Sequence, residues 1–279
     1  MKKLTIFLLL GLNQCMGVFY QPNSRIYTNP KRFKISVQDI YFRSTDKKML
    51  HAWLLKSDSK SLRGTVAHFH GNAQNISSHF LSTKWLVKEG YNVFIFDYRG
   101  YGQSDQTQPT PAGIRKDAHA ALDYVRQMPL ELRGAHLIVY GQSLGGIIAS
   151  DALLHYKYPQ KFKTLILEST FGSYQKIAVD KLSDFFLTWP FQWLGYLLVS
   201  DQYSPLEHLA HLEVKNKLVV HGSRDRIVPK KFGEQIYTNL NQNKQFWLVK
   251  GARHINCFSS SQKHMREKLI AYLGKVANE

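Results

Sequence analysis

The chain has 279 residues, of which 44% are hydrophobic and 20% charged, a composition that excludes a disordered or fibrous protein and allows a sizeable core. Its length is compatible with one domain, because a single α/β domain often reaches about 250 residues. The net charge of +17 favours anionic partners such as acidic lipid headgroups, or simply keeps the protein soluble. Nucleic acid is not an expected partner, because the sequence contains no recognisable nucleic-acid-binding module.

Residues 1–17 are expected to form a separate signal or membrane-anchor segment. Lys2 and Lys3 precede the apolar run Leu4–Leu12, which is the charged start and short apolar core of a secretory signal. The run is too short to span a bilayer as a helix. The alternative is an apolar strand or helix that belongs to the core. The first interpretation predicts export to the cell envelope and membrane association through the N-terminus.

Cys15 ends the string LNQC (residues 12–15), which resembles a bacterial lipoprotein cleavage site in which a leucine lies three residues before a lipidated cysteine. Gln14 departs from that pattern, because a small residue normally precedes the cysteine. The open alternatives are therefore lipidation of Cys15, cleavage after Gly17 and an uncleaved anchor. Cys257 would be the one cysteine left in the mature domain, so the fold is expected to depend on its core rather than on an internal disulfide.

Residues 18–279 are expected to form one domain in which short β-rich runs alternate with helical patterns, typical of a layered α/β fold. The runs VFIF, HLIVY, TLILE and KLVV are continuously apolar, which indicates strands buried on both faces of a mostly parallel sheet. The predicted strands are Ile35–Phe42, Met49–Leu55, Thr65–Phe69, Asn92–Asp97, His136–Tyr140, Thr164–Leu167, Leu218–His221 and Gln245–Val249.

Three helices are predicted from apolar periodicity. Within Ile114–Val125, apolar residues recur at i, i+3, i+4 and i+7 on one face, at Ala118, Ala121, Leu122 and Val125. A second helix follows Ser143 in LGGIIASDALLHY, and the third is Met265–Val276.

The long segment Phe171–Tyr203 interrupts the strand–helix alternation. It is rich in aromatic residues and contains Pro190 and Gly195, so it is expected to form a small helical cap over the site, with an ordinary crossover helix as the alternative. Its aromatic residues would form either an apolar acyl pocket or the core of the cap itself. These residues are Phe185, Phe186, Trp189, Phe191 and Trp193.

Residues 141–145 read GQSLG and fit the G-x-S-x-G motif directly after an apolar strand and before a helix. In that context the turn is so tight that the serine adopts a strained conformation and the residues two before and two after it must lack bulk. Ser143 is therefore the candidate nucleophile. The N–H group of Leu144 is expected to point at a developing oxyanion.

A serine nucleophile needs a base within hydrogen-bond reach, and the chain order serine, acid, histidine places both partners later in the sequence. His254 follows the last predicted strand and is the candidate base. Asp225 lies in a turn after the run KLVV and is the candidate acid that orients the imidazole; the alternative for Asp225 is a surface aspartate paired with a neighbouring arginine. Glu168, at the end of the preceding strand, is the rival acid.

The second oxyanion donor is expected in the loop after an early strand. There the segment HFHGNA (residues 68–73) places Gly71 where the backbone can turn sharply, with the N–H of Asn72 as donor and that of Ala73 as the alternative. His68 and His70 have an H-x-H spacing but no matching downstream ligand cluster, so no metal is expected.

The segments HFHGNAQN, FDYRGYGQSD, GQSLGG, GSRDRIVP and ARHI follow the order of motifs in the α/β-hydrolase superfamily, which the chain resembles over about residues 35–275. It looks most similar to the serine-aminopeptidase-like or lysophospholipase-like branch. The resemblance implies an eight-stranded sheet, attack on an acyl carbonyl through an acyl-enzyme, and no cofactor. It also implies a structural role for the loop at residues 97–102.

The predicted function is therefore a serine hydrolase that cleaves carboxylic esters or thioesters of small, lipid-like acyl substrates. A serine peptidase or amidase would use the same three residues and is the alternative within enzymes. A non-catalytic protein that binds membrane surfaces is the alternative from another class, and a missing member of the triad would favour it. None is missing from the sequence. The oligomeric state is not predicted.

Overall fold

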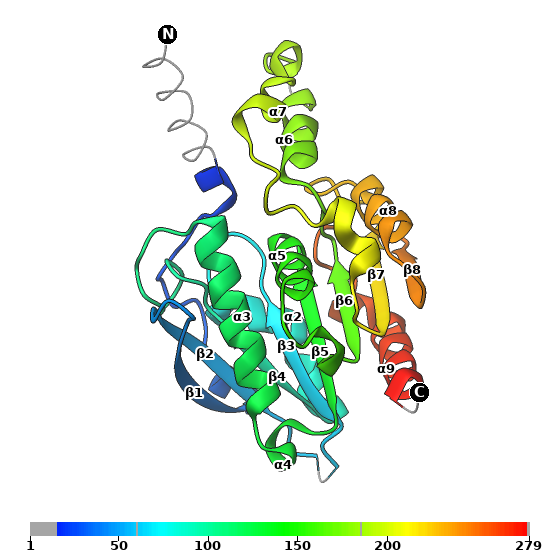
Figure 1. Ribbon diagram of the computed structural model, residues 1–279. Coiled ribbons are helices and arrows are strands. Elements are labelled where there is room, and N and C mark those ends of the chain that lie inside the picture. Colours follow the sequence, from blue (N-terminus) through cyan, green and yellow to red (C-terminus); the bar gives the residue numbers. More distant parts are fainter. Residues whose placement is uncertain (1–15, 60, 185, 278–279) are drawn as a thin grey trace.

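The computed structural model describes residues 16–59, 61–184 and 186–277, which form an eight-stranded sheet with helices on both faces (Figure 1). The predicted α/β-hydrolase fold with a mostly parallel sheet is confirmed, and each predicted strand overlaps an observed one. The strands are β1 (Ser36–Arg43), β2 (Met49–Lys56), β3 (Gly64–Phe69), β4 (Tyr91–Phe96), β5 (His136–Gln142), β6 (Thr164–Glu168), β7 (Asn216–Gly222) and β8 (Lys244–Val249).

The strand order across the sheet is β1-β2-β4-β3-β5-β6-β7-β8. β1 pairs antiparallel with β2, and β2 with β4, whereas all neighbours from β4 to β8 are parallel. Parallel strands all end at the same edge of the sheet, so the loops that follow β3, β5, β6, β7 and β8 gather there. The predicted functional residues lie in these loops.

The central strands are buried on both faces, as their continuous apolar runs predict. All described residues of β3, β4, β6 and β7 are buried. Side chains alternate between the two faces of each strand, so Leu137 and Val139 of β5 belong to one apolar cluster and Ile138 and Tyr140 to the other. The sheet therefore separates two cores, one beneath each layer of helices.

α3 is the longest described helix, and its local sequence explains where it begins. The Thr110 side chain accepts a hydrogen bond from the N–H of Gly113 (3.2 Å), and Pro111 occupies the first helical position, where the missing N–H costs nothing. The predicted apolar face of α3 is buried against the sheet. The α-helices are α2 (Ile76–Thr83), α3 (Pro111–Gln127), α4 (Leu130–Arg133), α5 (Leu144–Leu154), α6 (Tyr174–Ser183), α7 (Leu194–Leu198), α8 (Lys230–Asn239) and α9 (Lys263–Ala277).

Shorter 3₁₀ helices connect these elements. They are η1 (Met16–Phe19), η2 (Pro30–Phe33), η3 (Lys84–Glu89), η4 (Pro159–Lys161), η5 (Trp189–Phe191), η6 (Leu206–His211) and η7 (Ser260–Gln262).

Between β6 and β7 the chain makes a helical excursion instead of a single crossover helix. α6, η5 and α7 project from the sheet edge where the parallel strands end (Figure 1). The start of the described chain lies against the base of this excursion, since the Phe19 and Tyr174 rings meet edge to face at 4.9 Å. Leu4–Leu12 and Cys15 lie outside the described residues. Among the helices of the described residues, none is both long and apolar enough to cross a membrane.

Candidate active site

Ser143 sits on a sharp turn between β5 and α5, with φ 51° and ψ −120°. A positive φ is strained for a residue with a Cβ atom and persists only where the surroundings enforce it. Here the close packing of β3, β5 and α5 enforces it. A Cβ atom on Gly145 would lie 2.0 Å from the carbonyl oxygen of Phe69 in β3, and one on Gly141 would lie 2.6 Å from the Cα atom of Gly146 in α5. Both glycines are therefore required for this turn.

The structure brings the three residues predicted for the triad into one chain of hydrogen bonds. The Ser143 Oγ atom lies 3.0 Å from His254 Nε2, and His254 Nδ1 lies 2.8 Å from Asp225 Oδ2. Because an ionised carboxylate only accepts, Nδ1 carries the proton and Nε2 is left to accept the hydrogen of the serine hydroxyl. The Asp225 side chain is fully buried, whereas the His254 side chain is 13% exposed.

Asp225 is held by both of its oxygen atoms. Oδ2 accepts from His254, and Oδ1 accepts from the N–H groups of Ile227 (3.0 Å) and Val228 (2.9 Å). Burial alone would raise the pKa of this carboxyl, but the hydrogen bond and charge of His254 and the Val228 N–H outweigh it and hold the pKa below its usual value. Asp225 is therefore ionised at neutral pH.

His221 was not singled out from the sequence and supports the loop that carries Asp225. Its Nε2–H donates to the Val228 carbonyl oxygen (2.8 Å), and the same nitrogen lies 3.5 Å from Asp225 Oδ2. Burial lowers the pKa of His221 below its usual value, so the ring is neutral. Nothing in its own sequence context, the end of an apolar strand, distinguishes it from an ordinary core residue.

Glu168, the rival acid, makes its hydrogen bonds elsewhere. Its carboxylate accepts from the Tyr140 hydroxyl, from the Gln142 side-chain amide and from the N–H of Cys257 (2.8 Å). Gln142 precedes the candidate nucleophile and Cys257 follows His254 by three residues. Glu168 thus ties the two loops together without touching the imidazole.

The loop after β3 passes beside the candidate nucleophile, because a Cβ atom on Gly71 would lie 3.5 Å from the Ser143 Cβ atom. The Asn72 Oδ1 atom accepts from the N–H of Ala73 (2.7 Å), from the N–H of Gln21 (2.9 Å) and from the Tyr101 hydroxyl (3.1 Å). The Ala73 N–H is therefore occupied. Within the described residues, the Asn72 N–H has no hydrogen-bond acceptor, which leaves it available near Ser143.

The Leu144 N–H is available to a ligand because of its position at the start of a helix. Leu144 is the first residue of α5, and the first N–H groups of a helix have no carbonyl acceptor within it. Such a group at the positive end of the helix dipole suits an oxyanion.

Three histidines pack behind this loop and were not assigned a role from the sequence: His68 and His70 are buried, and His79 is half-buried. Burial lowers the pKa of His68 to about 3, and the pKa values of His70 and His79 are also lowered, chiefly by burial. All three rings are neutral and participate in the packing of the loop: His70 stacks on His79 at 5.0 Å and contacts Tyr98 at 4.5 Å. Across the described ranges no cluster of three or more potential ligands could hold a metal ion.

The loop at residues 97–102 is a structural element, as expected from the family resemblance. Arg99 is bound by Asp117 (2.7 Å) and Asp46 (2.8 Å), and Asp97 accepts from the N–H of Ile76 at the start of α2. These pairs join residues far apart in the sequence, and none of their members is hydrogen-bonded to Ser143 or His254.

The described aromatic residues between α6 and α7 that the sequence singled out are exposed, unlike Tyr174 at the start of α6, which is buried in the main core. The rings of the described members are more than half exposed, whereas the sequence predicted an acyl pocket or a small core. Phe185 lies outside the described residues. The exposed fractions are 75% for Phe186, 59% for Trp189, 53% for Phe191 and 56% for Trp193.

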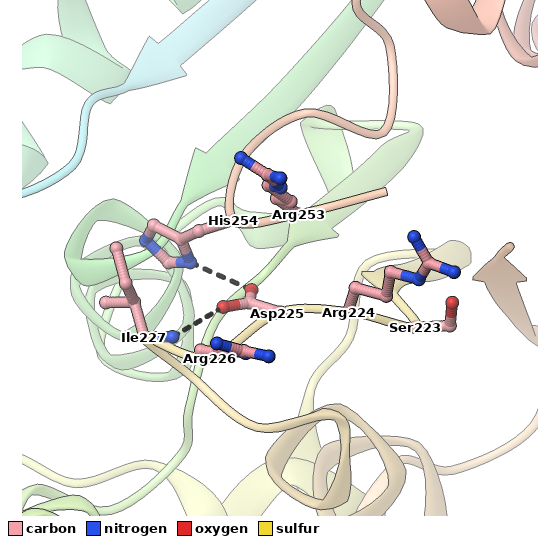
Figure 2. Close-up of a pocket in the computed structure, with 7 residues that line it drawn as sticks. All are labelled: Ser223, Arg224, Asp225, Arg226, Ile227, Arg253 and His254. Carbon is pink, nitrogen blue, oxygen red and sulfur yellow. Dashed lines mark hydrogen bonds and ion pairs between the residues drawn. The ribbon is translucent and has the colours of Figure 1, made fainter. Parts of the chain in front are cut away.

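A pocket of about 690 Å³ opens beside the His254–Asp225 pair. Figure 2 shows the two side chains at its wall and three arginine side chains around it. It is lined by Ser223, Arg224, Asp225, Arg226, Ile227, Arg253 and His254.

The family model described as "Serine aminopeptidase, S33" matches residues 60–217, which is more than half of the chain. The chain belongs to this family. The match includes Ser143 and its turn, while Asp225 and His254 lie beyond it. The predicted membership of the α/β-hydrolase superfamily is thereby confirmed.

Relatives cover nearly the whole chain. "Uncharacterized protein YfhR" of Escherichia coli is 30% identical over 267 residues, covering 94% of this chain and 88% of the relative. "Alpha/beta hydrolase domain-containing protein WAV2" of Arabidopsis thaliana is 29% identical over 261 residues, covering 90% and 82%. An esterase from Pyrococcus furiosus superimposes with a TM-score of 0.72 at 20% identity, covering 92% of this chain and 98% of the esterase, a likeness that shows the fold alone. Together these comparisons identify the chain as an α/β hydrolase.

Proposed function

We propose that this α/β hydrolase is a serine hydrolase that cleaves carboxylic esters or thioesters of lipid-like acyl groups through an acyl-enzyme. The observation that carries the proposal is the chain of hydrogen bonds from Ser143 Oγ, on its strained turn, through His254 to the buried, ionised Asp225.

In the first half-reaction the Ser143 Oγ atom attacks the acyl carbon while its proton passes to His254 Nε2. The negative charge of Asp225 stabilises the imidazolium that forms. As the tetrahedral intermediate collapses, the bond between the acyl carbon and the leaving oxygen or sulfur breaks, and the imidazolium returns the proton to the leaving group.

The tetrahedral intermediate carries its negative charge on the former carbonyl oxygen. The N–H groups of Leu144 and Asn72 are the proposed donors to this oxygen, since one begins α5 and the other belongs to the loop beside Ser143. In the second half-reaction water attacks the acyl-enzyme, with His254 as its base, and releases the acid and the free serine.

An ester or thioester fits the site better than the N-terminus of a peptide. An aminopeptidase must bind a positively charged α-ammonium group next to the scissile bond, which calls for an available carboxylate. The pocket beside the triad instead presents Arg224, Arg226 and Arg253, which repel an ammonium group, and its one carboxylate, Asp225, is engaged by His254.

The test is a series of p-nitrophenyl esters of increasing chain length beside a set of aminoacyl anilides, with the Ser143→Ala variant as background. The proposal predicts that the wild-type chain hydrolyses the esters and that the Ser143→Ala variant does not. Faster hydrolysis of the anilides than of every ester would replace the proposal with the peptidase alternative.

We also propose that the chain is exported and acts at a membrane. Three features support this proposal: the charged start followed by the apolar run Leu4–Leu12, the candidate lipidation residue Cys15, and the net charge of +17. One lipid chain anchors a protein only marginally, so stable attachment needs a second signal. The exposed aromatic residues of α6–α7 follow α6, whose first residue, Tyr174, contacts Phe19 near the start of the described chain, and they are suited to supply it.

A further inference from the structure

Three arginines lie around the pocket beside the triad, and they differ from the arginines of this fold that form ion pairs. Arg99 is bound by two aspartates, and Arg115 is bound by Asp151. In contrast, no acidic partner and no side-chain hydrogen bond is found among the described residues for the guanidinium groups of Arg224, Arg226 or Arg253, although all three are arranged around one pocket (Figure 2).

All three arginines are exposed, so solvent screens the repulsion among their positive charges but leaves their guanidinium groups accessible to an anion. An anion bound among them would relieve that repulsion. The planar guanidinium group also binds phosphate and carboxylate oxygens through two parallel hydrogen bonds, which a lysine cannot do. The pocket therefore suits an oxyanion group rather than a neutral or cationic one.

The position of the pocket indicates which part of a substrate would occupy it. His254 lines the pocket with Asp225, whereas Ser143 does not. His254 hands the proton from Nε2, which lies 3.0 Å from Ser143 Oγ, to the leaving oxygen or sulfur, so the leaving atom itself lies next to both side chains. A substituent of the leaving group that extends past the imidazole would reach the pocket. The volume of about 690 Å³ is ample for a small alcohol that carries a charged substituent.

We propose that this pocket binds a phosphate or carboxylate group carried by the alcohol or thiol part of the substrate. The inference rests on the proposed serine hydrolase function and adds the class of leaving group. The acyl part is not constrained by it. The anion orients the leaving oxygen toward His254, so recognition acts on the step in which the ester bond breaks.

The experiment compares esters that share one acyl chain and differ only in the alcohol: 2-phosphoethyl, 2-carboxyethyl, neutral 2-methoxyethyl and cationic 2-(trimethylammonio)ethyl. We expect kcat/KM for an anionic ester to exceed that for the neutral ester by about tenfold or more, and the cationic ester to be the poorest. The preference should weaken as ionic strength rises. Comparison of kcat/KM for the 2-phosphoethyl and 2-carboxyethyl esters shows which of the two anionic groups the pocket prefers.

The variant that tests the assignment carries Arg224→Gln, Arg226→Gln and Arg253→Gln together. Its ratio of kcat/KM for the anionic ester to that for the neutral ester should fall to about one, since the charge-assisted contacts are lost. The corresponding triple lysine variant should keep part of the preference, because it keeps the charge but loses the paired hydrogen bonds. If substitution at these three positions unfolded the protein, the lysine variant would lose its preference for the anionic ester as well, so the lysine variant also serves as the folding control.

The matched control removes three positive charges at the opposite edge of the sheet, with Arg32→Gln, Arg43→Gln and Lys47→Gln. These exposed residues lie in or beside η2 and β1, so their loss changes the net charge equally without touching the pocket. The control should keep the full preference for the anionic ester.

Equal rates for the anionic and neutral esters in the wild-type chain would overturn the inference and leave the proposed function standing, because ester hydrolysis would still be observed. Loss of the preference in the control as well would assign it to net charge and also overturn the inference. If the glutamine variant kept its preference but no longer bound anionic vesicles, the arginines would belong to a membrane contact instead. Failure of the proposed function itself would appear differently, as no Ser143-dependent hydrolysis of any ester.

Discussion

Asp225 is held by hydrogen bonds at both of its oxygen atoms and stays ionised although it is buried. Its two oxygens are occupied by His254 on one side and by backbone N–H groups on the other, and its pKa is held below the usual value despite burial. An asparagine at this position would keep the shape but lose the charge that stabilises the imidazolium, and it could present an N–H to Nδ1, which favours the wrong tautomer.

We therefore predict that Asp225→Asn and His254→Ala each lower kcat by about 10³-fold or more while the fold is kept. Glu168→Gln should cost much less activity, because Glu168 does not contact His254 and its loss affects only the support of the two loops. Steady-state kinetics with circular dichroism as a folding control makes the comparison. A Glu168→Gln variant that is more impaired than Asp225→Asn would transfer the role of the acid to Glu168.

His68 makes stability depend on pH. In the folded protein its Nε2–H donates to Gln142 and its Nδ1 accepts from the Thr83 hydroxyl, so the neutral ring is satisfied, and burial lowers the pKa from 6.5 to about 3. Between these two values the unfolded chain binds a proton that the folded chain does not. Lowering the pH through this range therefore stabilises the unfolded state, by about 1.4 kcal/mol per pH unit for each such group.

We predict a smaller free energy of unfolding at pH 5 than at pH 7 in urea titrations, and a smaller difference between the two in the His68→Gln variant. His264→Gln is the matched control, because His264 is exposed and its loss should leave the pH dependence unchanged. The same pH dependence in both variants would show that His68 does not contribute.

The hydrogen-bonded chain of Ser143, His254 and Asp225 could be predicted because the local motif and the chain order of the family specify its members one by one. The supporting residues could not. His221, Glu168 and the Arg99–Asp117 pair act through contacts between segments that are distant in the sequence, and each lies in a context typical of a strand end or a helix. Only the assembled fold distinguishes them from ordinary core residues.

At the scale of elements, the strands and three of the helices follow from the sequence. The central strands and α5 are buried on all sides and read as continuous apolar runs, whereas α3 and α9 are buried on one face and show apolar periodicity. α2 and α8 were not predicted. In α2 only four residues are buried, two of them Ser77 and Thr83, and in α8 the buried residues are Phe232, Gly233 and Ile236. Such short helices carry too few apolar repeats, and their positions are set by the strands around them.

The α6–α7 excursion was predicted as helical, but the exposure of its aromatic rings was not. Between Phe186 and Leu198 the chain contains no charged residue, although one residue in five is charged overall. Exposed tryptophan and tyrosine rings are typical of surfaces that meet the headgroup region of a bilayer. The two positions that present tryptophan, 189 and 193, are therefore expected to contact lipid.

We predict that Trp189→Ser combined with Trp193→Ser weakens binding to anionic vesicles by about tenfold, which corresponds to about 1.4 kcal/mol. Leu130→Ser combined with Leu132→Ser is the control, since these leucines are similarly exposed but lie on α4 at the opposite end of the molecule (Figure 1). Vesicle sedimentation measures both. Equal effects of the two pairs would remove α6–α7 from the membrane contact.

At the scale of the whole molecule, charge and the N-terminal segment act together. A chain with a net charge of +17 is attracted to acidic lipid over a distance set by the ionic strength, about 10 Å at 0.1 M salt. The same charge opposes self-association, because two copies would repel each other.

We predict that the full-length chain fractionates with membranes and that a chain beginning at Met16 is released into the soluble fraction with its activity intact. The shortened chain should still bind anionic vesicles at low salt and dissociate as salt is raised. Fractionation, vesicle sedimentation and mass spectrometry of the N-terminus are the measurements. A full-length chain with an unprocessed N-terminus in the cytoplasmic fraction would contradict export and would leave the triad untouched.

The central claim is that Ser143 is an activated nucleophile, and labelling with a fluorophosphonate probe followed by peptide mass spectrometry tests it most directly. The base His254 and the strained turn should make the Ser143 hydroxyl reactive, so the probe should modify Ser143 in the folded protein and leave the Ser143→Ala variant unmodified. Labelling that persists in that variant, or a folded wild-type protein that takes up no probe, would contradict the account.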